Sequence, residues 1–198
     1  MAMFKLIIGL GNPGNKHLKD RHNAGFWLVD EIAKSHHCSW QEESKFYGLI
    51  SKIKSPTGEC YLLKPNTFMN RSGQAVSALM RFHKINPNEI LVVHDELDLE
   101  PGNARLKWAG GLGGHNGLKD ITAQLGTQDY WRLRLGIGHP RRATDASKHM
   151  EVADFVLSAP NQDQQIEIER AIGVFVHVLP KIFAGHIQLA TQELHSNT

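Results

Sequence analysis

The sequence predicts an α/β fold, in which a single-domain, open, twisted and mixed β-sheet is flanked by helices. Three observations lead to this class. Aliphatic and β-branched runs such as "EILVVHD" are typical of buried strands. Segments with apolar residues at helical spacing separate these runs. The composition, 41% hydrophobic and 21% charged over 198 residues, is that of an ordinary globular protein, so residues 1–198 are taken as one domain.

The first half of the chain alternates between strands and helices. Phe4–Leu10 is predicted as a buried strand, and Asn23–His37 as a helix with one apolar face. Phe46–Ile53 and Glu59–Leu63 are predicted to pair as a hairpin, because "SPTG" between them is a turn sequence. Ser72–Lys84 is predicted as a second helix.

The second half begins with the buried strand "EILVVHD". Asn103–Trp108 and Arg132–Ile137 are predicted strands, with a helix at Gly117–Leu125 between them. A long helix over Gln162–Leu179 follows, and we expect Pro180 to stop it. Because strands alternate with helices, we expect an open sheet and not a barrel.

The segment "KLIIGLGNPG" matches the pattern G-x-G-x-x-G at Gly9, Gly11 and Gly14. A dinucleotide site needs the third glycine in the first turn of a helix, whose N–H groups hold the pyrophosphate. Here "NKHLKDRH" follows, which is polar and lacks helical periodicity, and the helix is predicted to begin only at Asn23. The pattern therefore favours a tight turn that presents Asn12 at the end of the first strand.

Polar side chains follow several of the predicted strands. Asn12 follows the first strand, Asn70 lies in "KPNTFMN" after the hairpin, and Asp95 ends "VVHD". His115 and Asn116 lie in the glycine-rich segment "GGLGGHNG". In open α/β sheets, ligands bind beyond the carboxyl ends of the strands, so these residues can converge there if their strands run parallel.

His22 stands directly before the first predicted helix, in "RHNAG". The dipole of a helix disfavours a positive charge at its N-terminus, and this helps to keep the imidazole neutral. Paired with Asp95, His22 could act as a base that activates water. With 12 histidines in the chain, a structural or surface role for His22 stays open. Neighbouring asparagine amides suit a carbonyl substrate, because they both donate and accept hydrogen bonds.

No metal and no cofactor are predicted. The sequence contains neither H-E-x-x-H nor a C-x-x-C pair, and Cys38 and Cys60 are expected to be reduced, structural thiols. His94 and Asp95 are neighbours in a strand, so their side chains should point to opposite faces of the sheet. No G-x-S-x-G motif occurs either, which disfavours a serine nucleophile.

The charge is unevenly distributed along the chain. Asn103–Met150 contains eight Lys or Arg residues and three acidic residues, on a protein of net charge +2. This local excess is compatible with a polyanionic partner bound at one face, although an unevenly charged solvated surface would give the same count.

Six blocks together resemble the bacterial-type peptidyl-tRNA hydrolase family. They are "GLGNPG", "RHNAG", "FMNRSG", "VVHDELDLEPG", "GGHNGLKDI" and "RLRLGIGHP", in that family's order from Gly9 to about Pro140. The later "VADFVLSAP" is similar to the family's lid, placed here at about 148–160, before C-terminal helices at about 162–194. The resemblance implies a monomeric, cytoplasmic, metal-independent hydrolase that needs no cofactor and no membrane. It would cleave the ester between peptide and tRNA in drop-off products of translation.

The resemblance also implies roles for individual residues. His22 would be the base, Asp95 would orient it, and Asn12 would bind the peptide carbonyl that distinguishes peptidyl-tRNA from aminoacyl-tRNA. The residues implied at the reaction centre and the tRNA 3′ end are His17, Phe68, Met69, Asn70, His115 and Asn116. Those implied to hold tRNA phosphates are Arg105, Lys107 and Arg134, all inside the basic region.

Two positions depart from the family's usual pattern. His17 replaces a tyrosine that packs beside the 3′ end, and Arg105 stands where lysine is frequent. Two other classes stay open at this point. A non-catalytic RNA-binding protein would use the same basic region without needing His22 and Asp95. A nucleotide-dependent oxidoreductase would need the helix that is missing after Gly14.

Overall fold

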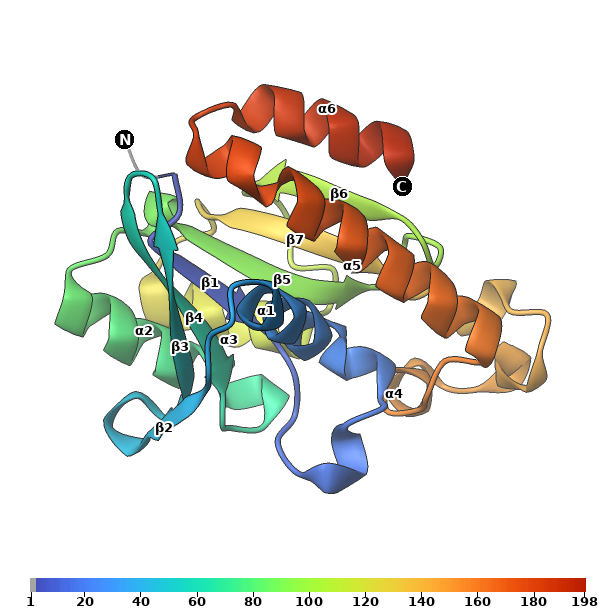
Figure 1. Ribbon diagram of the computed structural model, residues 1–198. Helices are drawn as coiled ribbons and strands as arrows, with labels where there is room; N and C mark the ends of the chain where they lie inside the picture. The colour runs from blue at the N-terminus through green and yellow to red at the C-terminus, as the bar shows by residue number, and fades with distance from the viewer. Residues whose placement is uncertain (1–2) are drawn as a thin grey trace.

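The computed structural model describes residues 3–198 and contains one mixed, seven-stranded β-sheet with helices on both faces (Figure 1). The strand order is β2-β3-β4-β1-β5-β7-β6, and β2 and β6 are separate edges, so the sheet is open as predicted. The strands are β1 (Leu6–Gly9), β2 (Gln41–Glu43), β3 (Gly48–Ser55), β4 (Gly58–Pro65), β5 (Ile90–Glu96), β6 (Ala104–Trp108) and β7 (Trp131–Gly136).

The four central strands, β4, β1, β5 and β7, run parallel to one another. Leu6 in β1 lies opposite Tyr61 in β4 and Ile90 in β5, so the three strands are closely in register. The carboxyl ends of these four strands consequently lie at the same end of the sheet. This arrangement meets the condition under which Asn12, Asn70 and Asp95 were expected to converge.

Helices cover both faces of the sheet. One face carries α1 (Ala24–Ser35) and α5 (Gln162–Phe183), and the other carries α2 (Ser72–His83) and α3 (Asn116–Leu125) (Figure 1). The short α4 (Val152–Val156) precedes α5, and α6 (Ile187–Asn197) packs against α5 beside β6. Within the described residues, no helix has the length and apolar character needed to cross a membrane.

Two apolar clusters, one on each face, form the core. In β1, Ile7 belongs to the cluster under α1 and α5, whereas Leu6 and Ile8 belong to the cluster under α2 and α3. A parallel strand that is buried on both faces must be apolar at every position, which explains the continuous run "LIIG".

Two features of the chain differ from the sequence predictions. The prediction that Pro180 stops the long helix is wrong, because α5 continues to Phe183. Proline removes one backbone hydrogen bond, but Ile182 and Phe183 are buried in the core, and this packing offsets the loss. Strand β2 was not predicted, since "QEE" is polar and forms a strand only by pairing with β3.

Gly14 does not open an α-helix. It has φ 99° and precedes a three-residue 3₁₀ turn, Asn15–His17, while α1 begins only at Ala24. The backbone cradle of a dinucleotide fingerprint is therefore absent from this segment of the described chain.

Gly25 permits the close packing of α1 on the sheet, and its replacement tests that packing. A Cβ atom there would lie 2.4 Å from the Leu10 nitrogen and 2.5 Å from the Val93 oxygen, both of them backbone atoms. We expect Gly25→Ala to lower the free energy of unfolding by about 1–3 kcal/mol, measured by urea denaturation.

Gly173 supplies the matched control. It is exposed on α5, and an added Cβ would meet no atom of the described residues within 4 Å. Gly173→Ala should raise the free energy of unfolding, by up to about 1 kcal/mol, because alanine favours a helix interior. Equal effects of the two substitutions would contradict the importance of the close approach at Gly25.

Candidate active site

Asn12 is held in one orientation by three hydrogen bonds. Its backbone N–H donates to Asn23 Oδ1 at 2.8 Å, and Asn23 Nδ2 donates to the Asn12 carbonyl at 3.0 Å. The N–H of Met69 donates to Asn12 Oδ1 at 2.8 Å. With its oxygen occupied, the side chain of Asn12 presents Nδ2, a donor, for another partner.

His22 and Asp95 form the pair expected from the sequence. His22 lies in the 3₁₀ turn Arg21–Asn23, directly before α1, and Asp95 lies at the carboxyl end of β5. The Nδ1 atom of His22 is 2.9 Å from both carboxylate oxygens of Asp95. Because an ionised carboxylate only accepts hydrogen bonds, Nδ1 carries the proton and Nε2 keeps a free lone pair.

His115 is the second imidazole that contacts Asp95. Its Nε2 lies 2.9 Å from Asp95 Oδ1, while its Nδ1 accepts the N–H of Gly117 at 3.1 Å and that of Leu118 at 3.4 Å. His115 therefore caps the N-terminus of α3 through Nδ1 and donates from Nε2 to Asp95. The sequence predicted His115 at the site but did not predict this contact.

The environment sets the charges of this group. Burial alone lowers the pKa of His22, but the adjacent Asp95 carboxylate outweighs it and raises the pKa above its usual value. Burial alone raises the pKa of Asp95, but the two histidines hold that pKa well below its usual range. On the opposite face of β5, burial and the neighbouring His115 lower the pKa of His94 to about 4, so His94 is neutral at physiological pH.

The pair faces a cavity of about 250 Å³. Its polar wall contains four residues that were predicted at the site, namely His22, Asp95, His115 and Asn116. The opposite wall is apolar and comes from Val152, Ala153 and Val156 of α4, which lies in the predicted lid. Four of the predicted residues thus meet at a cavity with one polar and one apolar side. Asn12, Phe68, Met69 and Asn70 do not line it.

A second cavity, of about 210 Å³, adjoins the first and shares His115 with it. Lys107 and Arg134, both predicted to bind phosphate, line it together with Arg132 and with two acidic residues, Glu96 and Asp98. Lys107 lies opposite Arg132 in the β6–β7 pairing, so these two side chains share a face of the sheet. The sequence reasoning counted Arg132 in the basic region but did not assign it to the site.

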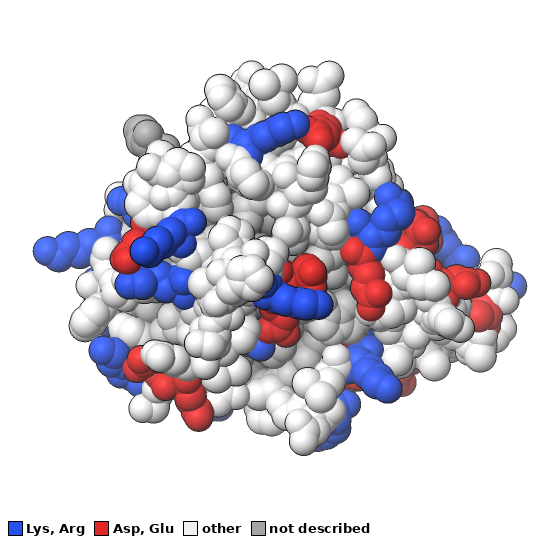
Figure 2. All heavy atoms as spheres, viewed as in Figure 1, with Lys and Arg blue, Asp and Glu red and all other residues white. Residues whose placement is uncertain are grey.

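Arg105 lies opposite Arg134 in the β6–β7 pairing, on the same face of the sheet as Lys107, but its side chain is engaged elsewhere. Its guanidinium donates to Asn103 Oδ1 at 3.1 Å and to Thr198 Oγ1 at 2.9 Å, and it does not line the cavity that holds Lys107 and Arg134. Arg134 itself is paired with Glu96 at 2.7 Å. Figure 2 shows basic and acidic side chains interspersed on the face covered by α1 and α5. The Lys107–Arg132 pair lies on the other face, because Leu106 and Leu133 point toward α5.

The other predicted residues lie around the end of the sheet. Met69 is buried and touches the site through its N–H bond to Asn12, whereas Phe68 and Asn70 on either side of it are exposed. His17 is partly buried, and its Nδ1 lies 2.6 Å from Asp20 Oδ2.

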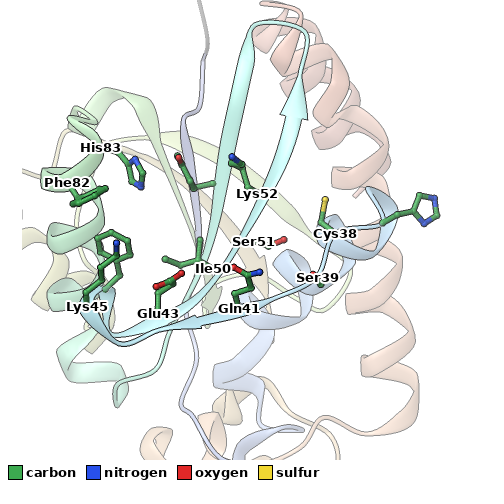
Figure 3. Close-up of a pocket in the computed structure, with 13 residues that line it drawn as sticks. Cys38, Ser39, Gln41, Glu43, Lys45, Ile50, Ser51, Lys52, Phe82 and His83 are labelled. Carbon is green, nitrogen blue, oxygen red and sulfur yellow. The ribbon is translucent and has the colours of Figure 1, made fainter.

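A larger cavity, of about 550 Å³, lies at the β2–β3 edge of the sheet (Figure 3). Two of its lining rings, those of Tyr61 and His83, stack with their centroids 4.2 Å apart, and Lys52 pairs at 2.9 Å with Glu59, which lies outside the cavity. None of the predicted site residues, all of which the structure describes, lines this cavity. Size alone therefore does not indicate the functional site.

His22, Asp95 and His115 also offer possible metal ligands, since one ligand atom from each lies within 4.8 Å of the others. In the sequence, "HDELD" together with His22 and His115 could also suggest a metal site, but the spacing of a known ligand motif is missing. In the structure, each of the two histidines is hydrogen-bonded to Asp95.

The fold and the site together are those of an α/β protein with a candidate hydrolytic centre. A buried His–Asp pair lies at the carboxyl ends of parallel strands, beside a cavity lined by three basic and two acidic side chains. The sequence matches the family model described as peptidyl-tRNA hydrolase over residues 6–198. The chain belongs to the peptidyl-tRNA hydrolase family.

Individual relatives agree with this assignment. The peptidyl-tRNA hydrolase of Polynucleobacter asymbioticus is 55% identical over 194 residues, which are 98% of this chain and 99% of that protein. The enzyme of Polynucleobacter necessarius is 54% identical over the same share of both chains. The crystal structure of peptidyl-tRNA hydrolase from Acinetobacter baumannii superposes with a TM-score of 0.90, at 36% identity, and covers 100% of this chain and 97% of its own.

The charge on His22 can be followed directly by NMR titration of the imidazole. We expect His22 to titrate above the ordinary value of about 6.5, and Asp95→Asn to lower its pKa, because burial then acts without the carboxylate. Asp20→Asn is the control, since Asp20 raises the pKa of His22 less than Asp95 does. An unchanged titration in Asp95→Asn would show that the carboxylate does not set the charge of His22.

Proposed function

We propose that the protein hydrolyses the ester bond between peptide and tRNA in peptidyl-tRNA and releases both products. The observation that carries the proposal is the His22–Asp95 pair, whose free Nε2 is available at a cavity that adjoins a second one, in which three basic side chains outnumber two acidic ones. Catalysis and phosphate binding would then take place side by side. Family membership supports the same substrate.

In the proposed reaction, His22 Nε2 takes a proton from a water molecule, and the resulting hydroxide attacks the ester carbonyl carbon. The tetrahedral intermediate collapses, the bond to the ribose oxygen breaks, and the imidazolium returns its proton to that oxygen. Asp95 stabilises the imidazolium and keeps the proton of the resting imidazole on Nδ1. Asn116 lies on the same cavity wall and can donate its amide to the developing oxyanion.

Substrate recognition in this proposal is divided between two regions. Asn12 Nδ2 donates to the peptide carbonyl that peptidyl-tRNA has and aminoacyl-tRNA lacks. Lys107 and Arg134 bind tRNA phosphates in the adjoining cavity. The scheme uses only side chains and water, so it needs no metal and no cofactor. We also propose that the enzyme is cytoplasmic, monomeric and formed by a single domain.

The base can be tested with a blocked aminoacyl-tRNA as substrate and EDTA in the assay. We expect the wild-type protein to release free tRNA, and His22→Ala to lower kcat by about 10²–10⁴-fold while tRNA binding persists. His186→Ala, at an exposed histidine outside the site, should retain activity. Loss of wild-type turnover in EDTA would contradict metal independence, and near-normal turnover of His22→Ala would exclude His22 as the base.

The donor role of Asn12 is tested by Asn12→Asp. One carboxylate oxygen can still accept the Met69 N–H, but the other replaces a donor with a charged acceptor. We expect kcat/KM for the blocked substrate to fall at least about tenfold, the effect of leaving a buried acceptor without its donor. Turnover of the unblocked substrate should change less. Asn88→Asp makes the same charge change at an exposed position, and an equal effect of both variants would rule out a specific role for Asn12.

A further inference from the structure

Arg21, the residue before His22, connects the base to the opposite wall of the cavity. The Arg21 side chain is 2% exposed. Its Nη1 donates to the carbonyl of Phe155 at 3.3 Å, and to the carbonyl and Oγ of Ser158 at 3.2 and 2.6 Å. Its Nη2 donates to Gln164 Oε1 at 3.0 Å, and the Arg21 N–H donates to the Ser158 carbonyl at 3.0 Å.

This guanidinium is unusual because all of these acceptors are neutral. Its plane lies over the Phe155 ring, 4.0 Å from the centroid, and Asp145 compensates the charge through space. The Nε atom is buried and has no hydrogen-bond partner in the described part of the chain. Burying a charge without a paired carboxylate is costly, so stability alone does not account for an arginine here.

Two of the acceptor residues, Phe155 and Ser158, lie at the C-terminal end of α4, and the third, Gln164, lies in the first turn of α5. Helix α4 has five residues, of which only Phe155 is buried, so it is too short to hold its position by itself. The Arg21 side chain supplies donors to the carbonyls of Phe155 and Ser158, and the Phe155 carbonyl also accepts the N–H and the Oγ–H of Ser158. The Arg21 guanidinium therefore joins the end of α4 to the turn that carries His22, alongside the packing of Phe155 in the core.

The other side of α4 forms the apolar wall of the catalytic cavity. Val152, Ala153 and Val156 face the space that His22 and Asp95 line. Arg21 belongs to the same 3₁₀ turn as His22. One residue thus sets the separation between the base and the wall opposite it.

We propose that Arg21 is a positioning residue, which holds α4 at the distance from His22 that lets both walls of the cavity contact the substrate. The proposal rests on the proposed function for its kinetic consequences. Loss of the guanidinium hydrogen bonds releases α4 and removes the contacts between the apolar wall and the substrate. The His22–Asp95 pair remains, because Arg21 does not donate to either side chain.

The test compares Arg21→Met, Arg21→Lys and Leu194→Ala. Methionine keeps an unbranched apolar chain against Phe155 and leaves no buried charge. Lysine keeps the charge but lacks the planar guanidinium group with its several N–H donors. Leu194 is fully buried in α6, far along the chain from α4, and its truncation provides a destabilised control. Amide hydrogen–deuterium exchange of each full-length variant reports on α4 without reference to activity.

For Arg21→Met we expect faster exchange at 152–158 and unchanged exchange in α1 and β5. KM for the blocked aminoacyl-tRNA should rise about tenfold, at the low end of what contacts in an apolar pocket contribute. The kcat value and the acidic limb of its pH profile should stay near those of the wild type, because the base is untouched. Arg21→Lys should restore part of both changes.

Other outcomes would overturn the proposal. Faster exchange throughout the chain, with a reduced kcat, an unchanged KM and the same behaviour in Leu194→Ala, would give Arg21 a purely structural role. Unchanged exchange at 152–158 would show that the Arg21 guanidinium does not hold α4. If the wild-type protein fails to cleave the ester, the proposed function is wrong, and the exchange data still decide whether Arg21 positions α4.

Discussion

The contact between His22 and Asp95 joins two segments that are 73 residues apart in the sequence. It requires the turn before α1 to meet the carboxyl end of β5 closely enough for a 2.9 Å hydrogen bond. Gly25 makes this possible, because α1 approaches the backbones of Leu10 and Val93 where a larger residue has no room. The parallel order of β1 and β5 brings those backbones together. The chemistry of the site therefore depends on main-chain packing as much as on the two side chains.

Main-chain groups also orient the other polar side chains of the site. The N–H of Met69 occupies the oxygen of Asn12, and the N–H groups of Gly117 and Leu118 occupy Nδ1 of His115. This leaves Nδ2 of Asn12 and Nε2 of His115 as the donors of the two side chains. The amide orientation of Asn12 and the tautomer of His115 therefore follow from the fold. His115 thus directs a donor at the Asp95 carboxylate, and in the proposed function Asn12 directs one at the substrate carbonyl in advance of binding.

Much of the fold and part of the candidate site could be predicted from particular residues. The apolar runs of β1 and β5 predicted buried strands, and Asn12 and Asp95 were expected to converge only if these strands ran parallel, which they do. The contact of His115 with Asp95 was not predictable, because it depends on how α3 is capped. Arg21 and Arg132 were also missed, since a buried arginine has no sequence pattern that separates it from a surface one. Strand β2 and the end of α5 depend on tertiary packing, which local propensity does not describe.

The two buried arginines, Arg21 and Arg132, have a further consequence. Arg132 donates to the carbonyls of Gly110 and Gly111, in the loop that leads to His115, as Arg21 donates to those of the α4 segment. Dissolved ions screen charges that face water, but they reach buried hydrogen bonds to neutral carbonyls far less. Ionic strength should therefore govern how strongly an RNA phosphate chain is held, while the shape of the cleft stays the same. Salt would thus change the affinity for RNA without changing the shape of the cleft.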